Sequence, residues 1–222
     1  MSLGRFQVPE NVLDLQRCQA DSMPFVRRVS GGGVIYHADE LTYSIVCSPG
    51  QLPPASTVKE SFRILTGFLI RFYQSLGLTA CYALDTVLNC ERLGVRTAFC
   101  FAGKESFDVM VNGNKIGGNA QRRHKNKIFQ HGSIPIVNHA VTGLKYMNDR
   151  TPEYARAATS LQDCGIVAEV DVLKPMIIDA FKQCMAAEIR TCQLSREEES
   201  ASQQLFNDKY ATDDWNLRGE AE

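Results

Sequence analysis

A hairpin signal followed by a run of small residues places the strongest constraint on how this chain can fold. Residues 107–111 read FDVMV, Asn112-Gly113 follows, and the chain returns through Lys115 into GGNA at 117–120. An Asn-Gly pair after such a run is typical of a tight two-residue turn, so we predict an antiparallel hairpin. Glycines are unfavourable inside strands and usually mark a place where another group approaches the backbone. The segment therefore predicts a sheet that carries a lysine beside room for a ligand.

Further strand patterns surround this hairpin. We expect strands at residues 25–29, 34–37 and 41–47, and another at 128–137 that is interrupted at 131–133. Together with the hairpin, these segments predict a mixed and mostly antiparallel sheet.

Helical patterns separate and follow the strands. Between Thr57 and Leu76, apolar residues recur every three or four positions, which indicates an amphipathic helix, and Gly77 is a suitable stop. Ser195 with Glu198 forms a capping-box pattern for a final helix. Before it, a helix carries an apolar stripe of Val172, Ile177, Ala180, Phe181 and Cys184. The order strands, helix, strands, helices predicts an α+β domain with helices flanking the sheet.

The bulk properties exclude several classes of protein. A net charge of -1 over 222 residues provides no overall field that attracts nucleic acid. No apolar stretch approaches the roughly 20 residues that a membrane helix needs. The eight cysteines form no C-x-x-C pair and show no zinc-finger spacing with a histidine, so we predict no metal site. Without a signal peptide, they indicate free thiols in a reducing cytosol.

The first candidate site is the loop Ser30-Gly31-Gly32-Gly33. Its backbone N–H groups can cradle a phosphate or pantetheine, although a flexible turn explains the same residues. Arg27 and Arg28 directly before it favour the ligand, because they place positive charge beside an open backbone. His37 closes the loop and can orient it.

The second candidate site pairs a thiol with a cation. Cys100 stands fifteen residues before Lys115 and between two phenylalanines. Such a cysteine is typical of a core, but a thiol near a cation is also what acyl transfer needs. His131, next to a glycine, is either an acid or base or a hydrogen-bonded sheet residue.

Four blocks of the chain together resemble the biotin/lipoate A/B protein ligase family. They are RRVSGGGVIYH at 27–37 with ELTYS at 40–44, NKIGGNAQR at 114–122, QHGSI at 130–134 and KYATDDWN at 209–216. The resemblance covers nearly the whole chain in order. It implies a single catalytic domain of this family over residues 1–222 and no C-terminal accessory domain. The family normally has a strand and a helix before the segment that matches residues 2–7, so we expect this first element to be missing.

The resemblance also implies an activity. Octanoyltransferases of the family carry a cysteine before the hairpin, as Cys100 does here, whereas typical adenylating ligases lack it. The implied enzyme is a cytoplasmic octanoyl-[acyl carrier protein]:protein N-octanoyltransferase of lipoate biosynthesis that needs no cofactor. The implied donor is octanoyl–acyl carrier protein, and the implied acceptor is a lipoyl domain or the glycine cleavage H protein.

The resemblance assigns roles to individual residues. Cys100 takes the acyl chain as a thioester, and Lys115 holds the acyl carbonyl, or serves as the base if burial favours its neutral form. The residues implied to bind substrate are Arg27, Arg28, Ser30, Gly31, Gly32, Gly33, His37, Gly117, Gly118, Asn119, Ala120, His131 and Gly132.

Two alternatives remain at this stage. In an ATP-dependent lipoate–protein ligase, which uses ATP and Mg, Lys115 would contact an acyl-adenylate and Cys100 would be a spectator. A non-catalytic homologue that binds carrier proteins is favoured if the first strand and helix are truly absent.

Overall fold

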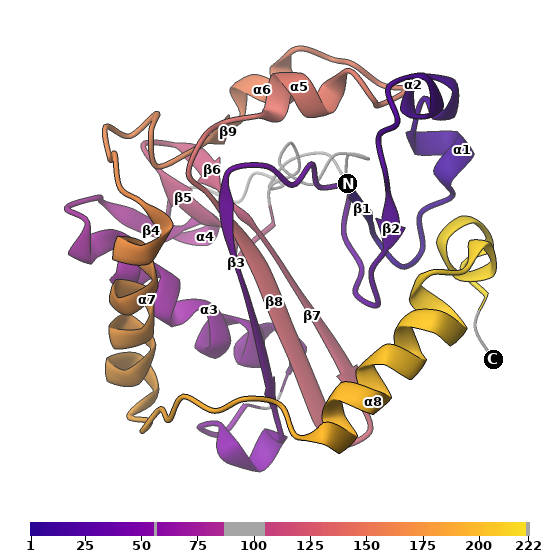
Figure 1. Cartoon of the computed structure of the whole chain (residues 1–222). Helices are drawn as coiled ribbons and strands as arrows, with labels where there is room; N and C mark the ends of the chain where they lie inside the picture. Colours follow the sequence, from indigo (N-terminus) through magenta and orange to yellow (C-terminus); the bar gives the residue numbers. More distant parts are fainter. Residues whose placement is uncertain (56, 87–104, 221–222) are drawn as a thin grey trace.

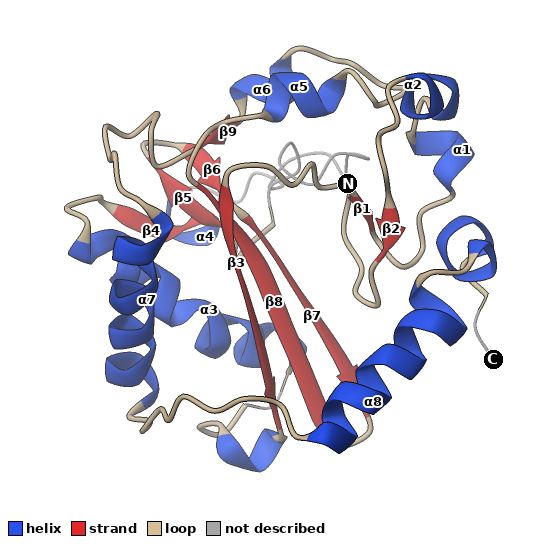
Figure 2. Cartoon of the chain, viewed as in Figure 1, coloured by secondary structure: helices blue, strands red, loops and turns tan. Residues whose placement is uncertain are grey.

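The computed structural model describes residues 1–55, 57–86 and 105–220, and shows central sheets with helices around them (Figure 1, Figure 2). The strands are β1 (Ser2–Leu3), β2 (Val26–Arg27), β3 (Glu40–Cys47), β4 (Ala80–Tyr82), β5 (Val109–Val111), β6 (Asn114–Ile116), β7 (Gly118–His124), β8 (Lys127–Pro135) and β9 (Ala158–Thr159). The helices are α1 (Pro9–Val12), α2 (Leu15–Ala20), α3 (Val58–Ser75), α4 (Ala83–Thr86), α5 (Ala140–Leu144), α6 (Glu153–Arg156), α7 (Val170–Met185) and α8 (Arg196–Leu205). Short helical turns lie at Pro49–Gln51, Phe206–Tyr210 and Asp214–Arg218.

Antiparallel pairing dominates the sheets, as predicted. One sheet has the order β3-β8-β7 and is antiparallel throughout. The other has the order β4-β5-β6-β9, and its β6–β9 pair is parallel. A separate pair, β1 and β2, is also parallel. The mixed, mostly antiparallel α+β architecture predicted from the sequence is confirmed.

Gly117 connects the two larger sheets between β6 and β7. Its φ is +85°, a conformation that L side chains rarely adopt. A Cβ at this position would lie 2.2 Å from the carbonyl oxygen of Ser133 on β8. Only glycine therefore lets the chain leave the β5–β6 hairpin and enter β7 beside β8.

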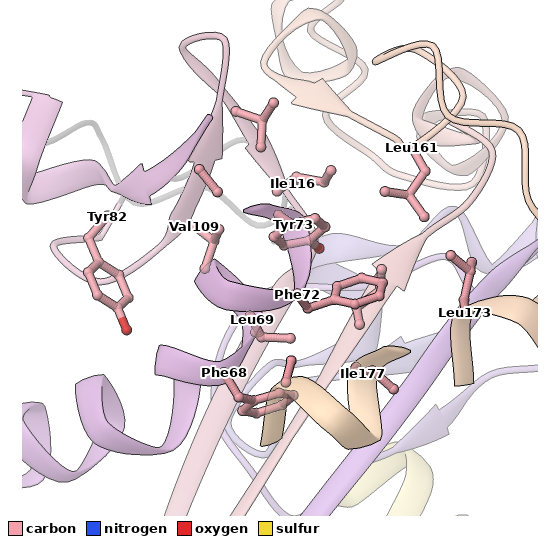
Figure 3. Close-up of a cluster of buried hydrophobic side chains, with 14 residues drawn as sticks. Phe68, Leu69, Phe72, Tyr73, Tyr82, Val109, Ile116, Leu161, Leu173 and Ile177 are labelled. Atoms are coloured by element: carbon pink, nitrogen blue, oxygen red, sulfur yellow. The ribbon is translucent and has the colours of Figure 1, made fainter. Parts of the chain in front are cut away.

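Helices α3 and α7 supply most of the main core. Thr57 and Glu60 cap the start of α3 reciprocally, and Gly77, with φ +80°, follows its end. The buried cluster, shown in Figure 3, includes Phe68, Leu69, Phe72, Tyr73, Tyr82, Val109, Ile116, Leu161, Leu173 and Ile177. Each such aliphatic or aromatic side chain contributes roughly 1.5–3 kcal/mol when it is removed from water. This cluster holds α3 and α7 against β4, β5 and β6.

A second cluster joins the N-terminal segment to the region of α5 and α6. It contains Leu3, Leu13, Cys18, Val34, Ile35, Ala140, Leu144, Tyr146, Met147 and Ala158. The N-terminal segment thereby lies over the side of the sheets opposite α3, as Figure 1 shows.

Several sequence predictions of local structure are confirmed. The helix predicted between residues 57 and 76 is α3, the Asn112-Gly113 hairpin joins β5 and β6, and Ser195 with Glu198 caps α8.

Three local predictions were wrong. Residues 34–37 do not form a continuous strand: within the described residues, Ile35 makes an isolated bridge to Ser2, and its side chain enters the second cluster. Strand β8 is not interrupted at residues 131–133, because Gly132 lets both neighbouring strands stay paired across it. On α7, Val172 is 54% exposed, since Leu173 is the residue that α7 turns into the core.

The described cysteines have free thiols, as predicted: Cys18, Cys47, Cys81, Cys164, Cys184 and Cys192. Cys90 and Cys100 lie outside the described residues. Across the described ranges, no helix is both long and apolar enough to cross a membrane.

Candidate functional site

A cavity of about 360 Å³ lies between the loop of residues 30–33 and the β3–β8–β7 sheet. We call the loop the glycine loop and the space the glycine-loop cavity. Its lining combines open backbone at Gly31 and Gly32 with aromatic and polar side chains from all three strands. The volume falls at the lower end of the range of about 300–1,000 Å³ that small-molecule sites occupy.

Arg28 fixes the shape of the glycine loop. Its Nη2 atom donates to the carbonyl oxygens of Gly31 and Gly33 at 2.9 and 2.6 Å. Its Nη1 atom donates to the carbonyl oxygen of Ser2 on β1 at 2.9 Å. Because Arg28 also lines the cavity, it brings positive charge to the wall while it holds the loop to the N-terminal strand.

His131 forms the opposite wall, on β8. Its Nε2 atom lies 2.5 Å from Ser30 Oγ, and the Phe129 ring stacks on it with ring centroids 4.9 Å apart. Burial, with the positive charge of Arg28 and the nearby His37, lowers the pKa of His131 to about 4. At pH 7 the ring is therefore neutral, with one donor and one acceptor nitrogen.

A hydrogen-bonded chain orients His37 at the edge of the cavity. Its Nε2 atom lies 2.7 Å from Ser2 Oγ, and its Nδ1 atom lies 2.5 Å from Glu40 Oε1. The second oxygen of Glu40 accepts a hydrogen bond from Ser133 Oγ at 2.5 Å. Glu40 thus links the histidine after the glycine loop to β8, so that His37 has a fixed ring orientation.

Asn119 and Gly132 make the floor between β7 and β8. The hydroxyl of Tyr43 donates to Asn119 Oδ1 at 2.8 Å, directly over Gly132. A Cβ at Gly132 would lie 2.1 Å from Asn119 Oδ1 and 2.7 Å from Tyr43 Cε1. Burial raises the pKa of the Tyr43 hydroxyl, which keeps it protonated and able to donate.

Arg27 points away from the cavity, into the junction between the two ends of the chain. It is 2% exposed, and its Nε atom donates to the carbonyl oxygen of Trp215 at 2.8 Å. In return, the indole nitrogen of Trp215 donates to the carbonyl oxygen of Arg27 at 2.7 Å. The guanidinium also donates to the carbonyl oxygens of Gly4, Arg5, Gln7, Asn216 and Leu217. Through these contacts Arg27 holds the two ends of the chain together, and it does not line the cavity.

Lys115 is buried on β6, three residues before Gly118 in the cavity wall. It is 4% exposed, and its Nζ atom lies 2.8 Å from Asp108 Oδ2. Ile116 packs into the α3 cluster, so the preceding side chain points to the other face of the sheet. Opposite Lys115 on β9 is Ala158, which belongs to the N-terminal cluster. Lys115 and the glycine loop therefore lie on the same side of the sheets.

Comparison with known proteins agrees with this geometry. The sequence profile of the Lipoyl protein ligase A/B catalytic domain matches residues 1–190. The chain belongs to this family.

Relatives within the family are named for octanoyl transfer. Octanoyltransferase LipM of Anoxybacillus flavithermus is 31% identical over 98% of this chain and 82% of its own length. Octanoyltransferase LipM of Kyrpidia tusciae is 32% identical over 98% of this chain and 83% of its own length. These matches confirm the predicted family and the prediction of an acyltransferase of the octanoyltransferase kind.

Solved structures confirm the family fold. Lipoate-protein ligase A bound with ATP superposes with a TM-score of 0.80 and 22% identity, over 97% of this chain and 81% of that one. A lipoate protein ligase of Thermoplasma acidophilum with bound lipoic acid gives a TM-score of 0.78 and 22% identity, over 98% and 81% of the two chains. At these identities the likeness concerns the fold of the lipoyl protein ligase domain.

The structure brings most of the predicted binding residues of this family member together. Those that line the cavity are Arg28, Gly31, Gly32, His37, Gly118, Asn119, Ala120, His131 and Gly132. Ser30 and Gly33 lie beside the cavity. Ser30 Oγ is hydrogen-bonded to His131 Nε2, and the carbonyl oxygen of Gly33 accepts a hydrogen bond from Arg28. Gly117 is the connection between β6 and β7. The proposed nucleophile Cys100 lies outside the described residues, so its assignment stays a prediction.

Sequence reasoning missed part of the lining and the partner of Lys115. The additional lining residues are Ser2, Ile35, Thr42, Tyr43, Ser44, Phe129 and Ser133. Thr42, Tyr43 and Ser44 belong to the block at residues 40–44 that carries the family resemblance. This block could therefore have been used to predict them as residues that line the site. Asp108 could not be predicted as the partner of Lys115, because a single aspartate before a hairpin is most often a turn residue.

Proposed function

We propose that this chain moves an octanoyl group from an acyl carrier protein to a lysine of a lipoyl domain, through a thioester on Cys100 and without ATP. The observation that carries the proposal is the glycine-loop cavity with the buried Lys115 on the same side of the sheets, three residues from the cavity wall. The relatives named as octanoyltransferases support the same chemistry.

In the first step the Cys100 thiolate attacks the carbonyl carbon of octanoyl–acyl carrier protein. A carbon–sulfur bond to the enzyme forms, and the carbon–sulfur bond to the carrier's pantetheine breaks. The carrier leaves as a thiolate, which takes up a proton, and the octanoyl chain remains on Cys100.

In the second step the neutral ε-amine of the acceptor lysine attacks the enzyme thioester. A carbon–nitrogen bond forms, the bond to Cys100 sulfur breaks, and the proton lost by the amine neutralises the released thiolate. The net change is thioester plus amine to amide plus thiol. An amide is more stable than a thioester, so the transfer needs no ATP and no other cofactor.

The glycine-loop cavity would hold the acyl chain during both steps. The open backbone at Gly31 and Gly32 lets a chain lie against the loop that Arg28 holds in place. His131, neutral at pH 7, offers a hydrogen bond without placing a charge beside the alkyl chain. Lys115 would attract the oxygen of the acyl carbonyl as negative charge develops on it in each step.

The partners follow from this chemistry. A lipoyl domain or a glycine cleavage H protein presents the acceptor lysine, and cytoplasm, where acyl carrier proteins work, is the proposed compartment. Among the similar solved structures is a bipartite lipoate protein ligase of Thermoplasma acidophilum that was studied with its E2 lipoyl domain. That pairing supports a lipoyl domain as the class of acceptor.

A transfer assay tests the proposal against the ligase alternative. The purified chain is incubated with an apo lipoyl domain and either octanoyl–acyl carrier protein alone or free lipoate with ATP and Mg²⁺. We expect modification of the lipoyl domain with the carrier thioester alone. Modification only with free lipoate and ATP would establish the ligase instead, and binding of the carrier protein without either reaction would establish a non-catalytic homologue.

A further inference from the structure

The ion pair between Lys115 and Asp108 differs from the other ion pairs of the described residues. Its two side chains are 5% and 6% exposed, whereas each other pair there has at least one clearly solvent-accessible member. A buried charge is costly unless a partner compensates it. Each member of this pair supplies a counter-charge that offsets the burial of the other.

The main chain holds the Asp108 carboxylate in place. The backbone N–H of Glu105 donates to Asp108 Oδ2 at 2.7 Å, and the N–H of Asp108 donates to the Glu105 carbonyl oxygen at 3.0 Å. The carbonyl oxygen of Asp108 accepts from the N–H of Ala83 at 2.8 Å. The carboxylate oxygen that meets Lys115 is thus part of a tight turn immediately before β5.

The strands beside Lys115 contribute no titrating side chain opposite it. Met110 faces it from β5 and Ala158 faces it from β9. The backbone N–H of Lys115 donates to the carbonyl oxygen of Ala157 at 3.0 Å, which fixes the start of the side chain. The carboxylate of Asp108 reaches the amine from the turn before β5.

We propose that Asp108 is a positioning residue that keeps Lys115 charged and aimed, so that Lys115 acts on the acyl carbonyl as a fixed cation and not as a base. The proposal rests on the octanoyl transfer argued above and decides between the two roles that Lys115 can have in it. A base must be neutral before it takes a proton, and a carboxylate at 2.8 Å in a buried site favours the ammonium form. An ammonium has three N–H donors, so a bond to Asp108 is compatible with a second bond to a carbonyl oxygen.

The consequence for catalysis is preorganisation. A cation that is already held in position stabilises a developing oxyanion without any reorganisation at the moment of reaction. Proton removal from the acceptor amine then falls to another acceptor, for which the departing Cys100 sulfur is chemically suited.

The variant Asp108→Asn distinguishes between Lys115 acting as a cation and Lys115 acting as a base. The variant preserves the shape of the side chain but removes the counter-charge that Asp108 supplies. The balance at Lys115 therefore shifts toward the neutral amine, and lower pH restores the ammonium form. The quantity to measure is the ratio of variant to wild-type kcat over a pH series, because ionisations shared by the two enzymes cancel in it. We expect this ratio to be roughly 100-fold below one at neutral pH and to rise as pH falls, with little change in KM for octanoyl–acyl carrier protein.

Two further variants complete the experiment. Asp171→Asn is the matched control, since it removes the same charge from an exposed aspartate–lysine pair, Asp171 with Lys174 at 3.1 Å. It should leave kcat unchanged at every pH. Asp108→Glu keeps the charge and should restore a large part of kcat with a wild-type pH profile. If Asp108→Asn does not fold, Lys115→Arg takes its place, because arginine stays charged and cannot take up a proton. Measurable octanoyl transfer by this variant would support the cation, and loss of all transfer would support the base.

Each result has a distinct meaning. A ratio at or above one at neutral pH, or one that rises with pH, would show that Lys115 works as a base and would overturn the proposal. A loss that is the same at every pH and that Asp108→Glu does not repair would reduce Asp108 to a structural residue. If wild-type enzyme transfers no octanoyl group without ATP, the proposed function fails first, and this outcome is separate from both others.

Discussion

Replacement of Arg27 by methionine tests whether this arginine belongs to the fold or to the substrate site. Methionine keeps an unbranched apolar side chain in the buried space but removes every donor that the guanidinium offers. The six carbonyl oxygens that accept from Arg27 lie at both ends of the chain, in residues 4–7 and 215–217. We therefore expect the variant to loosen the C-terminal turn from the N-terminal segment.

The size of the effect follows from the hydrogen bonds. Five of the six are 3.1 Å or shorter. At roughly 1 kcal/mol of net stability for each bond, their loss would lower the free energy of unfolding by about 5 kcal/mol, less whatever water recovers at the exposed carbonyls. For a chain of this length, 1 kcal/mol corresponds to about 2–4 °C in Tm, so we expect a fall of about 10–20 °C if unfolding is two-state.

Thermal unfolding and octanoyl transfer should be measured on the same preparations. Arg156→Met is the control, because the Arg156 side chain is 79% exposed, and its Tm should stay close to that of wild type. At a temperature where Arg27→Met is folded, KM for octanoyl–acyl carrier protein should be near the wild-type value. A nearly unchanged Tm together with a strongly raised KM would refute this reasoning and return Arg27 to the substrate site, as the sequence predicted.

Two other substitutions probe the cavity. Gly132→Ala should lower the free energy of unfolding by about 1–3 kcal/mol and lower kcat, because its Cβ would lie 2.1 Å from Asn119 Oδ1. Gly50→Ala is the control, because its Cβ would meet nothing within 4 Å. Equal Tm values for the two variants would contradict the packing described here. The lowered pKa of His131, about 4 against an ordinary 6.5, means that the unfolded chain binds an extra proton between these values, so stability should fall as pH drops from 6.5 to 4. His131→Asn should show a smaller fall across that window in denaturant titrations, and an identical pH dependence in the two proteins would show that His131 is not held neutral.

The sequence correctly predicted those helices and turns that are determined by residues close to one another in the chain. The three-to-four-residue spacing and the Gly77 stop predicted α3, Asn112-Gly113 predicted the hairpin, and Ser195 with Glu198 predicted the cap of α8. In each case the hydrogen bonds that decide the structure join residues a few positions apart.

Features that depend on distant contacts could not be predicted in this way. Arg27 precedes the glycine loop in sequence, yet its partners near Trp215 lie 188 residues away, so adjacency suggested the wrong environment. The glycine in β8 suggested an interruption, but the side chains of Asn119 and Tyr43, which come from two other strands, fill the space that it leaves. The resemblance to a family, and not the local pattern, supplied the grouping of the glycine loop with β7 and β8.

The central claim is that octanoyl transfer passes through a thioester on Cys100, and the intact mass of the protein tests it most directly. The chain is mixed with octanoyl–acyl carrier protein in the absence of ATP and acceptor, and its mass is recorded before and after an apo lipoyl domain is added. We predict that wild type gains one octanoyl group, passes it to the lipoyl domain, and loses this ability in Cys100→Ser. Cys192→Ser, which removes an exposed thiol, should behave as wild type. An adduct that persists in Cys100→Ser, or transfer that begins only when ATP is added, would contradict the account.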